Sequence, residues 1–154
     1  MKEISVSASM LIRRPPGEVF AAFVNPQTLR KFWLTDASGP LAPGARVQWT
    51  FMVPGATEKV VVTRFEAPRL LSFDWSDGIH VDMSFEPFAD GATAAKVAIS
   101  GFAGADATAQ AAGTVEGFSI VLCDLKTLLE TGESAQLVRA KADLIIAASA
   151  KQGG

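Results

Sequence analysis

Between residues 40 and 101 the sequence is divided at regular intervals by residues that favour turns. The breaks fall roughly 10 to 13 residues apart, and the runs between them are rich in Val, Phe, Trp and Thr. Short β-prone runs at such a spacing are typical of an antiparallel meander. The turns lie at Pro43-Gly44, Pro54-Gly55, Ala67-Pro68, Asp77-Gly78, Asp90-Gly91 and Gly101. We therefore predict five strands, near residues 46–53, 58–66, 69–76, 79–87 and 93–101.

The hairpin between the third and fourth of these strands allows its register to be predicted. Alternate residues are apolar in both strands. A two-residue turn would place apolar side chains opposite polar ones, whereas a three-residue loop over 76–78 brings the apolar faces together. We therefore predict that Trp75 pairs with Ile79 and Phe73 with Val81.

The N-terminal part adds one strand and two short helices. Residues 3–13 alternate between apolar and polar, which predicts a strand with one buried face. Pro16 suits the first turn of a helix, and Asn25-Pro26 can cap and begin a second one. Trp33 lies on the apolar face of that second helix. The prediction is thus six strands and two short helices before the last third of the chain.

The last third is helical. Residues 112–131 carry a single apolar stripe and are followed by Gly132, a common helix terminator. The stripe contains Val115, Phe118, Leu122, Leu125 and Leu129, and Ile120 points away from it. A second amphipathic stretch covers 134–149, where Leu137, Leu144, Ile145 and Ala148 align.

Bulk properties favour one globular α+β domain over residues 1–154, with a core near 3–132 and an extension near 133–154. Fourteen basic against sixteen acidic residues, a net charge of −2, give no basic patch, so we expect no nucleic-acid partner. No apolar run approaches ~18 residues, so we expect no membrane partner. With no charged leader before an apolar run and a single cysteine, Cys123, a cytoplasmic location is the expectation.

No residue stands out as catalytic. The sequence has no phosphate loop, zinc-ligand spacing or nucleophile elbow, and we predict no metal site and no cofactor. His80, the sole histidine, faces Asp74 on the solvent side of the sheet, beside Asp82. Cys123 lies off the apolar stripe of its helix. Two strand-end acids, at positions 58 and 66, do not pair in any register.

The large aromatic side chains of the strands face the same side as the helix stripe. They are consistent with a packed core or with an apolar pocket, and composition alone leaves both open.

The order of elements and several motifs are more specific. The motifs lie at residues 15–23 with Pro26, Leu29 and 32–33, at 38–49, 66–71, 73–75 and 100–102, and at Gly117-Phe118-Ser119-Ile120-Val121-Leu122 with 125–130. Together they resemble the SRPBCC superfamily, the START-like, birch-pollen-allergen-like helix-grip fold. Within it the chain looks most similar to bacterial proteins grouped with the activator of heat-shock-protein-ninety ATPase. The resemblance covers about residues 3–140.

The resemblance implies an apolar cavity between a curved antiparallel sheet and the long helix. A small apolar ligand would then contact Trp33, Trp49, Phe51, Phe73, Trp75, Met83, Phe85, Phe118, Leu122 and Leu125. The leading hypothesis is a binding or carrier protein. The alternatives are a cyclase- or hydrolase-like enzyme, for which Thr63 or Arg64 would have to point inward, and a chaperone-ATPase interaction module. Ile120 and the apolar side of 134–149 leave a homodimer open.

Overall fold

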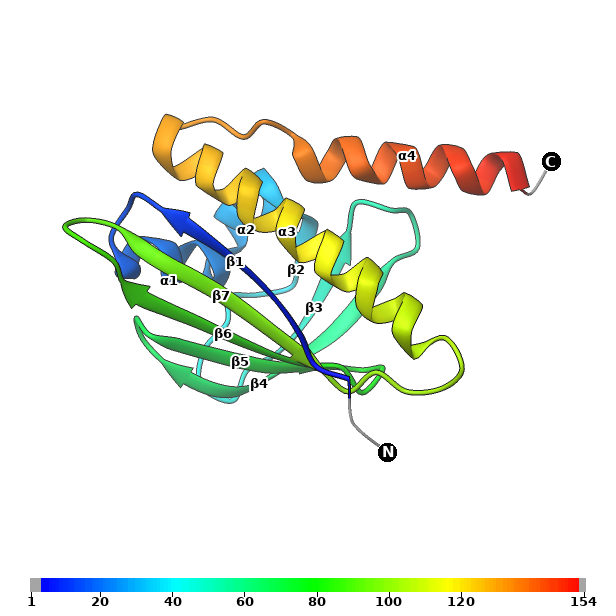
Figure 1. The fold of residues 1–154 in the computed structure, drawn as a ribbon, viewed down its shortest axis with the longest axis horizontal. Helices are drawn as coiled ribbons and strands as arrows, with labels where there is room; N and C mark the ends of the chain where they lie inside the picture. The colour runs from blue at the N-terminus through cyan, green and yellow to red at the C-terminus, as the bar shows by residue number, and fades with distance from the viewer. Residues whose placement is uncertain (1–3, 153–154) are drawn as a thin grey trace.

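The computed structural model describes residues 4–152, so the outermost residues of the predicted domain, 1–3 and 153–154, lie outside the described part. Seven strands form one antiparallel sheet in the order β1-β7-β6-β5-β4-β3-β2. The elements are β1 (Val6–Ile12), α1 (Pro16–Val24), α2 (Pro26–Phe32), β2 (Leu34–Ala37), β3 (Arg46–Phe51), β4 (Thr57–Glu66), β5 (Leu70–Trp75), β6 (His80–Pro87), β7 (Thr93–Ser100), α3 (Ala107–Thr131) and α4 (Leu137–Gln152). The sheet curves, α3 crosses one of its faces, and α4 runs back beside α3 (Figure 1). The helix-grip fold predicted from the sequence is confirmed.

The sequence analysis predicted six strands and the sheet has seven, because β2 lacks the alternating pattern that predicts a strand. Three of its four residues pair with the end of β3, including Leu34 with Phe51 and Ala37 with Trp49. A register shift between Leu34 and Asp36 interrupts the pairing. Only the two end residues of the strand are buried, so the period-2 alternation that predicts a strand is missing.

The predicted register of the β5–β6 hairpin is confirmed. Phe73 lies opposite Val81, and the Trp75 amide donates to the carbonyl of Ile79 at 2.9 Å. Gly78 closes the three-residue loop in the left-handed conformation, at φ 90°. Gly101, at the end of β7, packs so closely on this loop that an added Cβ would lie 2.3 Å from the Gly78 carbonyl oxygen.

The sequence did not predict which side chains of β4 point into the core, and a β-bulge in this strand decides it. Val60 and Val62 are buried, and the register then shifts between Val62 and Arg64. Thr63 and Arg64 are both exposed as a result. The inward-pointing polar residue that the enzyme alternative required is therefore absent from this part of β4.

The long helix begins at Ala107, five residues before the predicted start at 112. The Ala-rich stretch from 104 to 113 looked ambiguous because it has no large apolar residue to mark a face. Alanine is nevertheless the strongest helix former, and Ala111 is buried against the core. At its other end α3 is tied to β1, since Lys126 donates to the Leu11 carbonyl and the Glu130 carboxylate accepts from the Arg13 amide.

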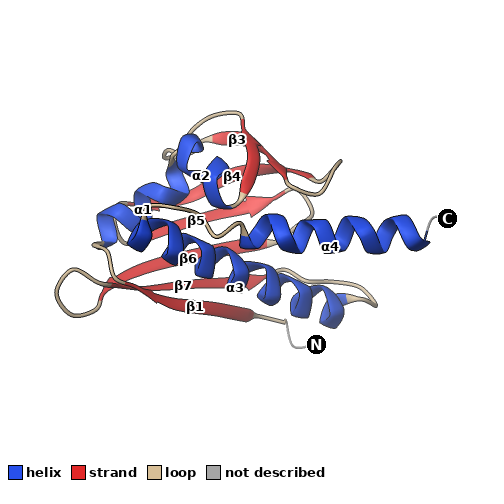
Figure 2. Cartoon of the chain, turned by 90° about the horizontal axis from the view of Figure 1, so that it is seen from above, coloured by secondary structure: helices blue, strands red, loops and turns tan. Residues whose placement is uncertain are grey.

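The extension forms α4, three residues later than the predicted 134–149. Its C-terminal end reaches past the edge of the sheet (Figure 2). No helix within residues 4–152 is long and apolar enough to cross a membrane.

Candidate functional site

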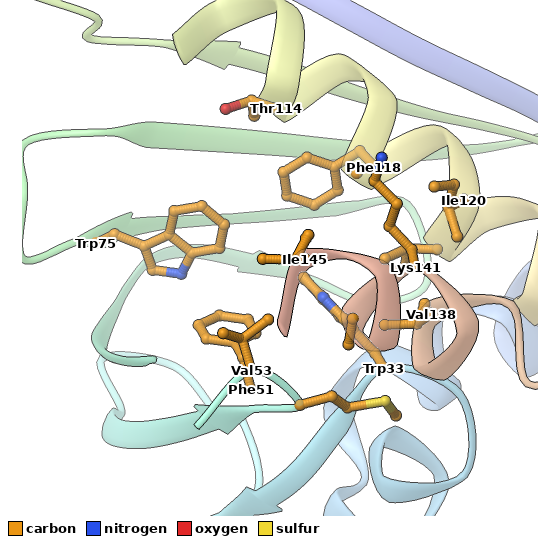
Figure 3. A pocket seen from close by; sticks show the side chains of 14 residues that line it. Trp33, Phe51, Val53, Trp75, Thr114, Phe118, Ile120, Val138, Lys141 and Ile145 are labelled. Atoms are coloured by element: carbon orange, nitrogen blue, oxygen red, sulfur yellow. The ribbon is translucent and has the colours of Figure 1, made fainter. Parts of the chain in front are cut away.

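A cavity of about 240 Å³ lies where α3, α4 and the ends of β3 and β5 meet. Its lining is almost entirely apolar and comes from five segments far apart in the sequence (Figure 3). The lining residues are Trp33, Phe51, Met52, Val53, Trp75, Thr114, Gly117, Phe118, Ile120, Val121, Val138, Lys141, Ala142 and Ile145.

The structure divides the ten predicted ligand contacts into two groups. Four of them border this cavity: Trp33, Phe51, Trp75 and Phe118. The other six are at most 1% exposed and belong to the packed hydrophobic core: Trp49, Phe73, Met83, Phe85, Leu122 and Leu125. The open space therefore lies on the α4 side of α3, along residues 114–121, near the ends of β3 and β5.

The aromatic walls are arranged in defined geometries. The rings of Trp75 and Phe118 are nearly parallel, 12° apart with centroids separated by 5.9 Å. Phe51 stands at 84° to Trp75, and Trp33 contacts Phe118 edge-on at 5.5 Å. The buried indole N–H of Trp75 has no hydrogen-bond partner among the described residues. This wall thus presents flat aromatic surface, with a donor left unpaired among the rings.

The wall from α4 was missed by the sequence analysis. Val138, Lys141, Ala142 and Ile145 line the cavity, and the side chain of Ile145 lies among the aromatic rings of the other walls (Figure 3). The sequence pattern aligned Ile145 with Leu144 instead, but Leu144 is 68% exposed. Two apolar stripes lie side by side on this helix, so periodicity alone could not decide which one packs inward.

Contacts at the start of α4 orient the helix so that the stripe with Val138 and Ile145 faces the cavity. Asp124 of α3 is fully buried, and its carboxylate accepts from the Ser134 hydroxyl at 2.6 Å and the Ala135 amide at 2.8 Å. Arg139 donates to the Met52 carbonyl at 3.4 Å. These bonds hold the α3–α4 connection and dock the first half of α4 over the cavity. A single acidic residue in a helix gave no sequence signal for this role.

Polar groups at the cavity are few. Lys141 carries the one charge among the lining residues in the described part of the chain. Its ammonium group lies 2.7 Å from the Glu116 carboxylate of α3, which is outside the lining. The Thr114 hydroxyl donates to the carbonyl of Gln110 at 2.8 Å. Within the described part of the chain, the lining contains no carboxylate or imidazole that could serve in acid–base chemistry.

The histidine cluster lies away from the cavity, on the solvent face of the sheet as predicted. His80 pairs with Asp74 through Nδ1 and with Asp82 through Nε2, the latter at 2.9 Å. The hydrogen bond with Asp74 raises the pKa of His80 above its ordinary 6.5, and the charge of Asp82 acts in the same direction. Ser72 completes the cluster by donating to Asp82. This is a cross-strand ion-pair cluster that stabilises the β5–β6 hairpin.

The remaining candidates are also apart from the cavity. Cys123 is half-buried on α3 and does not line it. Glu58 accepts from Ser76, and Glu66 pairs with Arg64, so the two acids do not meet. Within residues 4–152 no group of three or more His, Cys, Asp or Glu side chains could hold a metal ion.

A second hollow, of about 430 Å³, lies at the C-terminal ends of α2 and α3. Polar and charged residues such as Arg30, Lys31 and Glu133 border it, and no predicted ligand contact reaches it.

Residues 13–130 match the family model described as activator of Hsp90 ATPase homolog 1-like protein. The chain belongs to this family. The match ends before α4, so four of the cavity's lining residues come from an element outside it. A search of curated proteins gave no match.

Solved structures agree with the family assignment. The chain is 26% identical to the protein SSP2350 from Staphylococcus saprophyticus, with a TM-score of 0.76 over 86% of this chain and 96% of that one. It is 19% identical to the Aha1 dimer from Colwellia psychrerythraea, with a TM-score of 0.75 over 85% and 99%. For the AHSA1-like protein from Aeromonas hydrophila the identity is 23% and the TM-score 0.64, over 84% and 94%. The last two likenesses concern the fold alone.

Proposed function

We propose that the protein binds a small apolar ligand in the cavity between α3 and α4. The observation that carries the proposal is the cavity itself, an open space of about 240 Å³ walled by aromatic and aliphatic side chains. Ligand sites are typically concave and mostly apolar, with few polar groups that set orientation. Carriage or sequestration fits this lining better than catalysis, because the lining offers no acid–base pair.

The test uses naphthalene and isothermal titration calorimetry. We expect saturable binding of one molecule per chain with a negative heat-capacity change, the sign of apolar burial. Gly117 lines the cavity, and an added Cβ would meet no atom within 4 Å. Gly117→Leu should therefore place its side chain in the open space and abolish binding.

Gly113→Leu is the matched control. Gly113 lies one turn earlier in α3, also has no atom within 4 Å of an added Cβ, and does not line the cavity. Both variants replace a helix glycine, so both should keep α3 folded. Binding that is absent in the parent protein, or equally strong in both variants, would refute the proposed function.

The family description supports a second candidate, an interaction with a chaperone ATPase. Such an interaction would use exposed surface rather than the cavity. The ATPase rate of the bacterial chaperone, measured with and without the protein, tests it directly. An unchanged rate would remove this candidate while leaving ligand binding in place.

Self-association is a further candidate for the exposed side of α4. Leu144 is 68% exposed on this side, Ile145 is still 41% exposed although it borders the cavity, and a similar structure is described as a dimer. Light scattering should then give twice the chain mass, and Leu144→Lys should return it to the monomer value. A monomer at all concentrations would contradict this candidate.

A further inference from the structure

We propose that the cavity selects a planar aromatic acid of about two fused rings, whose anionic group pairs with Lys141. This inference rests on the proposed function and names the ligand class for the same site.

The shape of the walls favours a flat ligand. Trp75 and Phe118 form a near-parallel pair, and Phe51 closes the far side at a steep angle. Aromatic ligands stack on, or meet edge-on, such rings and gain more than their buried area alone provides. A saturated ring of the same carbon skeleton is thicker and lacks these ring–ring contacts.

The volume limits the size of the ligand. An apolar cavity of about 150 Å³ holds benzene. The 240 Å³ found here is larger by about the space of one further fused ring. It remains below the ~300 Å³ at which pockets for drug-sized molecules begin. The volume therefore matches a two-ring compound.

The charge at the edge of the cavity selects an anion. Lys141 extends from α4 toward α3 beside Phe118 (Figure 3), and among the described lining residues it alone can offer a positive charge to a bound ligand. Its partner Glu116 is 56% exposed and Lys141 37%, and exposed pairs of this kind contribute little net stability. A ligand carboxylate can therefore replace Glu116 at little cost.

This charge belongs to α4 and lies outside the family match at 13–130. The selectivity for an acid is thus a property of this chain's own extension, and the aromatic wall from β3, β5 and α3 belongs to the matched region.

The test compares 2-naphthoate with 2-naphthamide, which share ring size and shape and differ in charge. By calorimetry, the parent protein should bind the acid about fivefold more tightly than the amide, the factor expected for one ion pair at a partly exposed edge. In Lys141→Met, which keeps an apolar stem, the ratio of the two affinities should fall to about one. The parent ratio should also fall as salt is raised.

Two further variants test the same ratio from other directions. Glu116→Gln removes the competing carboxylate and should raise the ratio above that of the parent. Lys96→Met removes an exposed lysine of β7 that does not line the cavity, and it should leave the ratio unchanged. If Lys141→Met also disturbs α4, the Glu116→Gln variant, which changes an exposed residue, tests the acid-to-amide affinity ratio by itself.

Decahydro-2-naphthoate, the saturated counterpart, tests the flat-ring requirement and should bind several-fold more weakly than 2-naphthoate. Equal affinities of the parent protein for acid and amide, or tighter binding of the saturated acid, would overturn the inferred ligand class. The proposed function would still stand if naphthalene binds. Failure of all these compounds, naphthalene included, would overturn both.

Discussion

The centre of the sheet is covered by a tightly packed core, whereas the ends of β3 and β5 border an open cavity. Aromatic side chains from the sheet face both regions. Toward the middle of the sheet, large side chains such as Trp49 and Phe73 interlock at a centroid distance of 5.3 Å. Toward the end of β3, the covering helix is α4, which contributes small or branched residues such as Val138 and Ala142. The difference shows that aromatic residues on a strand face do not define a pocket; the size of the side chains opposite them does.

The largest expected effect contrasts two phenylalanines from these regions. Phe73→Ala should lower the free energy of unfolding by about 3–5 kcal/mol, because it opens a void in a filled interior. Phe51→Ala should cost only about 1–2 kcal/mol, because that half-buried ring already borders open space. Urea denaturation measures both, and equal losses would break the comparison between the two regions.

Asp124→Ala tests what holds α4 over the cavity. The buried Asp124 carboxylate satisfies two donors, so its removal should cost about 1–3 kcal/mol and weaken naphthalene binding. Ser134→Ala removes only one of the two bonds and should cost about 0.5–1.5 kcal/mol. Naphthalene affinity that survives Asp124→Ala unchanged would show that α4 docks without this anchor.

A smaller effect sharpens the comparison along α3. Gly117→Ala adds a methyl group beside the cavity, and Gly113→Ala adds one away from it. Neither meets a neighbour, so each should raise stability by about 0.5–1 kcal/mol through helix propensity. A loss of stability at Gly117 alone would mean that the space beside it is not open.

The smallest effect lies outside both regions, at His80. Its raised pKa means that protonation favours the folded state, so the stabilisation is present below about pH 6.5 and is lost as the pH rises through the folded value. His80→Gln should therefore cost more at about pH 5.5 than at about pH 9, in both cases under ~1 kcal/mol for an exposed cluster. An NMR titration of the ring protons gives the pKa directly, and a value at or below 6.5 would contradict the prediction.

Much of the fold was predictable because it depends on local patterns. Turn spacing predicted five strands of the meander, and matching apolar faces predicted the register of the hairpin at Gly78. The exceptions were places where the pattern is interrupted: the bulged β2 and the Ala-rich start of α3. The candidate site was predictable only in part, since four of ten expected contacts border the cavity and its α4 wall was not foreseen.

By itself, the sequence determined the fold class, the order of the elements other than β2, and the buried face of α3 and of strands such as β5 and β6, because periodicity and turn chemistry are properties of short segments. It left open which face β4 and α4 bury. Only the tertiary structure decided where space remains. That outcome depends on the summed volumes of side chains from distant segments and on the Asp124 contacts that orient α4. Phe73 and Phe51 look alike in sequence, and their separate places in a filled interior and beside a cavity come from what packs against them.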